Sequence, residues 1–184
     1  MMDLRLNSNI WKLFINQLTQ KRYYIPILSI FFLTLPDATA KQIGLWSGIG
    51  FLSEFLFEIP SGYISDKIGH KKTLILSKIF MLLASIFFVI ENSLIYFILG
   101  AVFTSLSYAS QSGTRPAFLH ETLVSLKSEK YFIKTSSKIS AKVALLSIPF
   151  LIIIPYFAKI NIRLPLVLSI IIDVIGLLVV ISLI

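Results

Sequence analysis

A basic stretch in the first half of the chain decides the fold, and it reads Gly62-Tyr63-Ile64-Ser65-Asp66-Lys67-Ile68-Gly69-His70-Lys71-Lys72. Long apolar segments flank it, at about residues 43–64 and 73–90. Each is close to the length of about 20 residues that an α-helix needs to cross the hydrocarbon core of a bilayer. A short basic connection between two such segments is typical of a turn that joins two transmembrane helices on the cytoplasmic side.

The composition of the chain is that of a membrane protein. Of its 184 residues, 56% are hydrophobic and only 14% are charged, and the mean hydropathy is +0.85. A soluble domain of this size needs more polar surface. Four further apolar segments approach spanning length, at about 10–35, 94–118, 139–157 and 164–184. The sequence therefore predicts an all-α membrane protein of six transmembrane helices, with no room for a soluble catalytic domain.

The positive charge falls mainly on one side of this arrangement. Fourteen of the 17 Lys and Arg, Lys78 among them, lie toward one side, and only Lys41, Lys159 and Arg163 lie toward the other. Because cationic loops stay in the cytoplasm, both termini are predicted to be cytoplasmic and the chain to lie in the cell (plasma or inner) membrane. Topology explains the net charge of +8, so no nucleic-acid partner is expected.

The first segment is unusually polar. Its uninterrupted apolar run, 23–35, has 13 residues and would span only about 20 Å as a helix. The helix must therefore extend back toward Trp11, which brings Gln17, Gln20, Arg22 and Tyr24 into the membrane zone. Such side chains must face protein or water, because a charge that faces lipid is costly. Alternatively, the basic pair at 21–22 anchors a short helix at the interface.

The stretch 62–72, preceded by Glu58-Ile59-Pro60-Ser61, resembles the signature loop of the major facilitator superfamily (MFS), Gly-x-x-x-Asp-(Arg/Lys)-x-Gly-(Arg/Lys)-(Arg/Lys). His70 stands where the family has Arg or Lys, so the charge at this position can be lost near neutral pH. The resemblance implies a twelve-helix fold of two homologous halves, each built from 3+3 inverted repeats. Residues 1–184 would then form the amino-terminal half, and the loop would latch it to the carboxy-terminal half in one alternating-access state.

The residue types of this loop suit such a latch. Gly62 permits close approach of a neighbouring helix, and Asp66 can accept hydrogen bonds at a facing helix amino terminus. Gly69 suits a turn of positive φ. Lys67 and Lys71, with Lys72, would hold the loop on the cytoplasmic side and pair with acids.

A second stretch, 112–121, resembles a small-residue and acidic pattern found in part of the superfamily. Gly113 and Ala117 share a helical face and permit close packing. Glu121 follows as a candidate partner for Lys71 or His70, forming a charge relay with the acid of the first loop. Alternatively, Glu121 is an exposed acid that ends the helix.

Ionisable residues inside predicted membrane helices are candidate functional groups. By the helical rise, Arg22 lies about 16 to 18 Å from the cytoplasmic end of its helix, and Glu54 about 16 Å from the outer end of the next. The two are therefore predicted to pair near the midplane, and Arg115 is predicted to reach the level of Glu58. Such pairs either line a substrate or proton cavity, with Gln17, Gln20 and Tyr24, or hold the bundle statically. Asp173, in the last helix, has no predicted partner.

Two His, no Cys and no His-Glu-x-x-His pattern argue against an intramembrane metalloprotease. No catalytic residue, metal site or cofactor is predicted. The resemblance implies instead a secondary transporter that moves a small-molecule substrate across the lipid bilayer, coupled to an ion or proton gradient. The chain is expected to be a fragment, or the product of a split gene that acts with a carboxy-terminal half encoded elsewhere; alternatively, it would act with a second copy. The alternative function is that of a non-transporting membrane assembly or regulatory partner.

Overall fold

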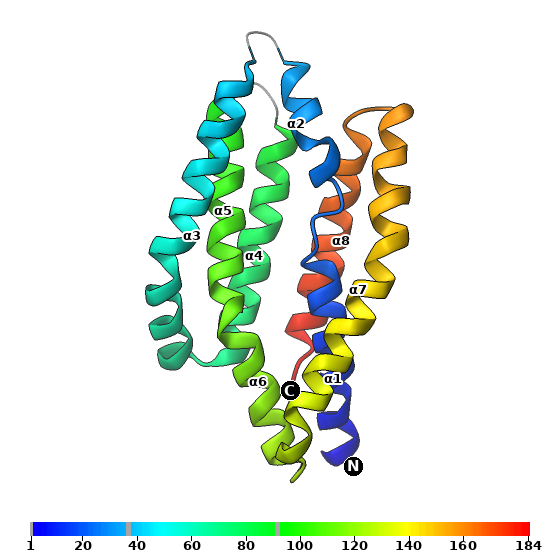
Figure 1. Ribbon diagram of the computed structural model, residues 1–184. Helices are drawn as coiled ribbons and strands as arrows, with labels where there is room; N and C mark the ends of the chain where they lie inside the picture. The colour runs from blue at the N-terminus through cyan, green and yellow to red at the C-terminus, as the bar shows by residue number, and fades with distance from the viewer. Residues whose placement is uncertain (1, 36–37, 91–92) are drawn as a thin grey trace.

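The computed structural model describes residues 2–35, 38–90 and 93–184, with side chains from residue 6 onward. The described part of the chain contains helices and no strands. Figure 1 shows the helices as an elongated bundle in which successive segments run alternately between its two ends. The elements are α1 (Met2–Thr19), α2 (Ile25–Leu33), α3 (Ala40–Ile68), α4 (His70–Val89), α5 (Leu94–Ser112), α6 (Thr114–Ser125), α7 (Phe132–Tyr156) and α8 (Leu164–Ile181), with short 3₁₀ turns η1 (Glu129–Tyr131) and η2 (Phe157–Lys159).

The first predicted helix is broken, so its prediction as one continuous segment over 10–35 is wrong. α1 ends at Thr19, and α2 begins at Ile25 with Pro26 in its first turn. Proline disfavours a helical conformation at the residue before it, which explains why α2 starts here instead of continuing α1. The break places Gln20 and Arg22 in a non-helical segment inside the bundle, where both are buried.

The stretch that decides the fold forms two helix ends and almost no loop. α3 runs to Ile68 and α4 starts at His70, so Gly69 alone joins them. Its φ of +93° lies in the region that only glycine adopts readily. The expected positive φ at Gly69 is confirmed, whereas the expected loop over 66–72 is wrong, because one glycine is enough to reverse the chain. At its other end α3 starts with a reciprocal capping box between Thr39 and Gln42.

The second half contains a similar one-residue interruption and a longer helix than predicted. Gly113 separates α5 from α6, which continues to Ser125, beyond the predicted end at residue 118. α7 starts at Phe132, so most of the polar stretch 127–138 is helical. The predicted helices end at residue 118 and begin again at residue 139, so this stretch was expected to be a loop. Its Lys and Ser residues instead extend the helix beyond the apolar run. α7 also continues through Pro149 to Tyr156, with Pro155 in its last turn.

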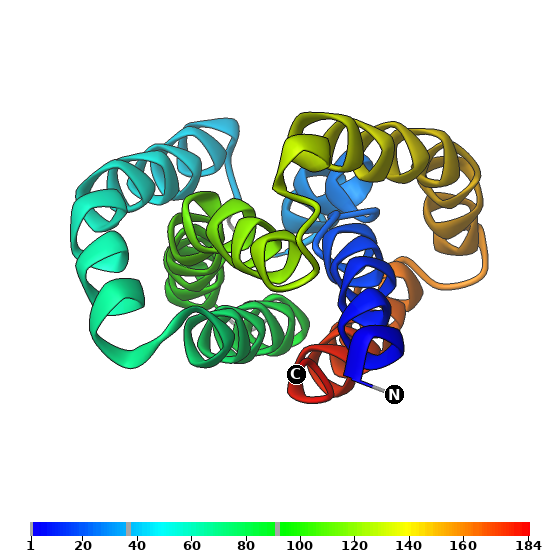
Figure 2. The same ribbon diagram turned by 90° about the horizontal axis from the view of Figure 1, so that it is seen from below.

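The apolar core of the bundle consists of two clusters of buried residues. One holds aromatic residues of α2, α3, α4 and α5, including Phe31, Trp46 and Phe97. The other joins α1, α4, α6, α7 and α8 through residues such as Leu13 and Val143. Figure 2, the view along the bundle, shows α3, α4 and α5 together on one side and α1, α7 and α8 on the other. Along α4 and α8, buried polar residues lie between the residues of the two clusters: Ser77 and Lys78 on α4, and Ser169 and Asp173 on α8.

Within the described ranges, four helical segments are long and apolar enough to cross a membrane: His70–Val89, Leu94–Ser125, Glu129–Lys159 and Leu164–Ile181. α3 has 29 residues but does not reach the same apolarity, and α1 and α2 are separate pieces. Asn9 of α1 exchanges hydrogen bonds of 2.7 and 3.1 Å with the backbone of Ile184. The two ends of the chain therefore lie at the same end of the bundle, as Figure 1 also shows.

Candidate functional site

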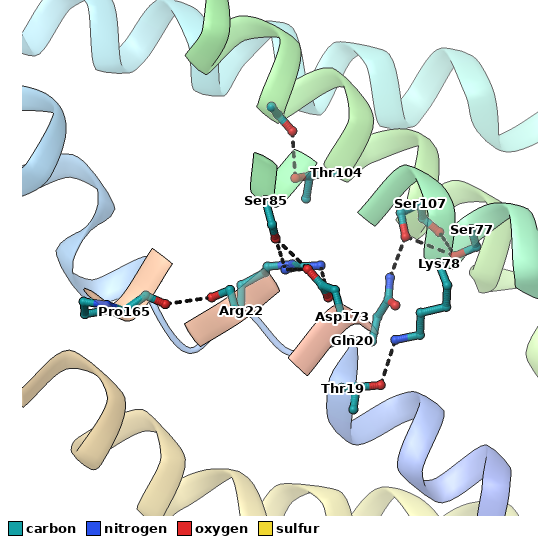
Figure 3. Close-up of polar contacts among 12 residues, drawn as sticks. Thr19, Gln20, Arg22, Ser77, Lys78, Ser85, Thr104, Ser107, Pro165 and Asp173 are labelled. Carbon is teal, nitrogen blue, oxygen red and sulfur yellow. Dashed lines mark hydrogen bonds and ion pairs between the residues drawn. The ribbon is translucent and has the colours of Figure 1, made fainter. Parts of the chain in front are cut away.

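A bidentate ion pair lies at the break between α1 and α2. Arg22 Nη1 is 2.9 Å from Asp173 Oδ2, and Nη2 is 3.0 Å from Oδ1. Ser85 Oγ on α4 donates to Asp173 Oδ2 at 2.5 Å and accepts from Arg22 Nη1 at 3.0 Å. All three side chains are buried, and Figure 3 shows them converging from three segments. The expected pairing of Arg22 with Glu54 is therefore wrong, because both guanidinium Nη atoms bind Asp173 on α8.

Lys78 is the second buried cation of this layer. Its Nζ donates to Asn16 O at 3.1 Å and to Thr19 Oγ1 at 2.9 Å, as Figure 3 shows for Thr19. Among the residues that the structure describes, no carboxylate lies within 4 Å of this ammonium. Lys78 was counted among the cations toward the cytoplasmic side; its side chain is fully buried, on the face of α4 that meets the end of α1.

A hydrogen-bond network continues the polar layer into α5. Gln20 Nε2 donates to Ser107 Oγ at 2.8 Å, and Ser77 Oγ donates to the Ser107 carbonyl at 3.0 Å. Gln111 Nε2 donates to Gln20 Oε1 at 2.9 Å. The sequence analysis singled out Gln20 but not Ser77, Ser107 or Gln111. The sequence contains one sign of this network: small polar residues recur within apolar helices. Ser77 and Ser85, for example, are about two turns apart and therefore lie on one face of their helix.

A cavity of about 300 Å³ adjoins the ion pair between the α1–α2 break, α3 and α5. Arg22, Tyr24 and Glu54, three of the predicted cavity residues, line it together. The aromatic residues Trp46 and Tyr108 line it as well, with Phe51 and Phe88. Within the described part of the chain, Arg22 Nε and Trp46 Nε1 are buried donors without a hydrogen-bond partner.

The other predicted cavity residues lie elsewhere. Gln17 and Arg115 line a smaller hollow of about 60 Å³ with residues of α6 and α7, and Gln20 belongs to the network described above. Glu58 is exposed on α3 and lines a different hollow from Arg115, near the α3–α4 junction. The structure therefore gathers only part of the predicted set at one place.

A side-chain relay links the α3–α4 junction to α6. Thr114 Oγ1 donates to Ser65 Oγ at 2.9 Å, and Ser65 Oγ lies 2.8 Å from His70 Nδ1. His70 Nε2 lies 3.3 Å from Glu121 Oε1. Of the two partners considered for Glu121, the structure selects His70, because Lys71 Nζ donates to Leu183 O at 2.5 Å.

The remaining residues of this junction face outward. Asp66 and Lys67 are exposed, and the Lys67 ammonium lies 6.0 Å from the centre of the Tyr63 ring. Asp66 lines a hollow of about 330 Å³ with Glu58 and His70. A Cβ built on Gly62 meets no atom within 4 Å. The close helix approach expected at Gly62 therefore does not occur within this chain.

The family model of the Major Facilitator Superfamily matches residues 13–124, which include the ion-paired break, the α3–α4 junction and the cavity. The chain belongs to this superfamily. MFS membership makes it a multi-pass membrane protein of a transporter family and points away from enzymatic catalysis. Membership of this superfamily also explains the spacing of the glycine, acidic and basic residues around the α3–α4 junction.

Two curated relatives carry transporter names. The "Uncharacterized transporter BU466" of Buchnera aphidicola subsp. Acyrthosiphon pisum (strain APS) is 28% identical over 85% of this chain and 40% of its own length. An "Uncharacterized transporter" of Buchnera aphidicola subsp. Schizaphis graminum (strain Sg) is 34% identical over 41% of this chain and 19% of its own length. The chain thus spans less than half the length of these relatives. No solved structure matches it.

Proposed function

We propose that this chain is the amino-terminal half of a secondary MFS transporter, which moves a small solute by alternating access in combination with a carboxy-terminal half. The observation that carries the proposal is the cavity of about 300 Å³ beside the buried ion pair. It combines an ionisable side chain, Glu54, with aromatic walls beside the break between α1 and α2. Binding sites of secondary transporters commonly lie near such broken helices.

The proposal includes six membrane crossings with both termini in the cytoplasm. α1 with α2 would form the first crossing and α3 the second, although neither is apolar throughout. The polar residues of the broken helix are buried against other helices, as a membrane interior requires. The proposal also includes coupling of transport to a gradient of protons or another ion. It places the protein in the cell membrane.

The second half would cover the open face of α3. Phe51, Phe55 and Ile59 expose 75%, 74% and 85% of their surface along this helix. At the same level as the junction, Gly62 leaves room for another helix. A carboxy-terminal half, or a second copy of this chain, would pack there and close the cavity from the other side. Asp66 and Lys67 would then form the cytoplasmic latch against it.

Transport in membrane vesicles tests this function. Uptake and efflux of a broad solute panel are compared for the chain alone, for the chain with a candidate carboxy-terminal half, and for that pair carrying Asp66→Asn or Glu54→Gln. We expect transport by the pair only, with a strong loss in both variants. If the folded pair moves none of the solutes, the chain is better explained as a non-transporting membrane assembly partner.

A further inference from the structure

We propose that the cavity between α2, α3 and α5 binds an organic cation. This inference rests on the proposed transport function and adds the chemical class of the substrate. It follows from two features of the cavity lining, its net charge and its aromatic walls.

The charge available to a ligand in this cavity is negative. Arg22 is the cation in the lining, but Asp173 neutralises it through two hydrogen bonds of 2.9 and 3.0 Å. Glu54 is the acid in the lining and is half-buried. Within the described residues, no Lys, Arg or His nitrogen lies within 4 Å of its carboxylate. A carboxylate in a partly desolvated site attracts a cation and repels an anion.

The walls suit a cation whose surface is largely apolar. Tyr24, Trp46 and Phe88 form a continuous aromatic wall, with ring centres 5.9 Å apart for Tyr24 and Phe88 and 6.3 Å apart for Trp46 and Phe88. Phe51 and Tyr108 add further rings. Aromatic faces attract organic cations, most strongly where water is excluded. Tyr24 already shows this interaction, because the Arg22 guanidinium carbon lies 5.8 Å from its ring centre.

Tryptophan fluorescence can report binding directly, because the chain has two Trp residues. Trp11 lies 59% exposed on α1, far along the chain from the cavity, so the Trp11→Phe variant leaves Trp46 in the cavity wall as the reporter. The full 184-residue chain in lipid nanodiscs is titrated with benzoylcholine, a cation with an ester group. It is also titrated with 3,3-dimethylbutyl benzoate, in which carbon replaces the charged nitrogen, and with (5-phenylpentyl)trimethylammonium, which lacks the ester.

Benzoylcholine and (5-phenylpentyl)trimethylammonium are each expected to bind at least about tenfold more tightly than the neutral ester, a difference of about 1.4 kcal/mol. Glu54→Gln should weaken benzoylcholine binding by at least about tenfold and leave the neutral ester unchanged. Glu58→Gln is the matched control, because it removes an acid one turn further along the same helix that does not line this cavity. It should leave all three affinities unchanged.

The outcomes separate the substrate class from the proposed function. Equal binding of benzoylcholine and the neutral ester, unaffected by Glu54→Gln, would overturn the cation class while leaving the cavity as a ligand site. If the folded chain bound none of the three probes, the cation class would be wrong, and the transport assay would decide separately whether the function stands.

Discussion

Arg22 and Asp173 together solve the problem of placing charge in an apolar interior. Each charge alone would carry a large desolvation penalty, whereas the bidentate contact satisfies four of the polar atoms involved. Ser85 adds a further hydrogen bond to each partner. The pair also joins the α1–α2 break to α8, at opposite ends of the chain. Its structural role is therefore to hold a non-helical segment inside the bundle.

Removing one partner of this pair should be strongly destabilising. Asp173→Asn leaves the Arg22 charge buried without a counter-ion, and we expect a loss of about 3 to 5 kcal/mol in the free energy of unfolding. The loss is measured by denaturant unfolding of the purified chain in detergent micelles. Asp66→Asn, which changes an exposed acid, should change the stability by less than about 0.5 kcal/mol.

A double variant tests the mechanism of this loss. Arg22→Met combined with Asp173→Asn removes both charges and should recover most of the stability, because neither member of the pair is left as an unpaired charge. Equal unfolding free energies for Asp173→Asn and Asp66→Asn would show that the ion pair does not hold the bundle together.

α8 lies close to α1 and α4 at a glycine, where a larger side chain would not fit. Gly176 of α8 faces Thr19 and Lys78, and a Cβ at this position would lie 3.0 Å from Lys78 Nζ and still closer to Thr19 Oγ1. The absence of a side chain thus makes room for the lysine and its hydrogen bonds. Gly69 acts differently, since its positive φ allows α3 to turn directly into α4.

Gly176→Ala should therefore be destabilising despite the higher helix propensity of alanine. The added methyl group displaces Thr19 or Lys78, and we expect a loss of about 1 to 3 kcal/mol in unfolding free energy. Gly48→Ala is the control, because its Cβ would meet no atom within 4 Å. It should be neutral or stabilising by about 0.5 to 1 kcal/mol. Parallel denaturant curves of the two variants measure the difference, and equal stability would contradict the close packing of α8 against α1 and α4.

At the scale of the whole molecule, α3 leaves a large face uncovered. This helix carries exposed aromatic residues together with the half-buried Glu54 and exposed Glu58. The same face opens onto the cavity. A helix with this mixture can cross a membrane when a partner covers its acids, which connects the six-crossing topology to the proposed second half.

Single-cysteine labelling tests whether α3 crosses the membrane. The chain has no Cys, so Lys41→Cys and Lys72→Cys each introduce one thiol, near opposite ends of α3. A membrane-impermeant maleimide should label Lys41→Cys in intact cells, and Lys72→Cys only in inverted vesicles. Labelling of both variants from the same side would contradict a crossing by α3 and, with it, the arrangement of six crossings.

Several features of this protein follow from the sequence itself. Apolar segments of spanning length predict a helical membrane protein, and the motif around Gly62, Asp66 and Gly69 identifies the superfamily that the family model matches. The positive φ of Gly69 and the partnership of Glu121 with His70 were also within reach of sequence reasoning. These features depend on local composition, on short spacing or on a motif.

Only the tertiary structure decided which distant residues meet. Asp173 lies 151 residues from Arg22, so no spacing rule relates them, and sequence reasoning paired Arg22 with Glu54 instead. Lys78 resembles a cytoplasmic lysine until α1 and α8 are packed around it. Helical periodicity defines the face of a residue on its own helix, but the rotation and depth of each helix against its neighbours depend on the packing of the whole bundle.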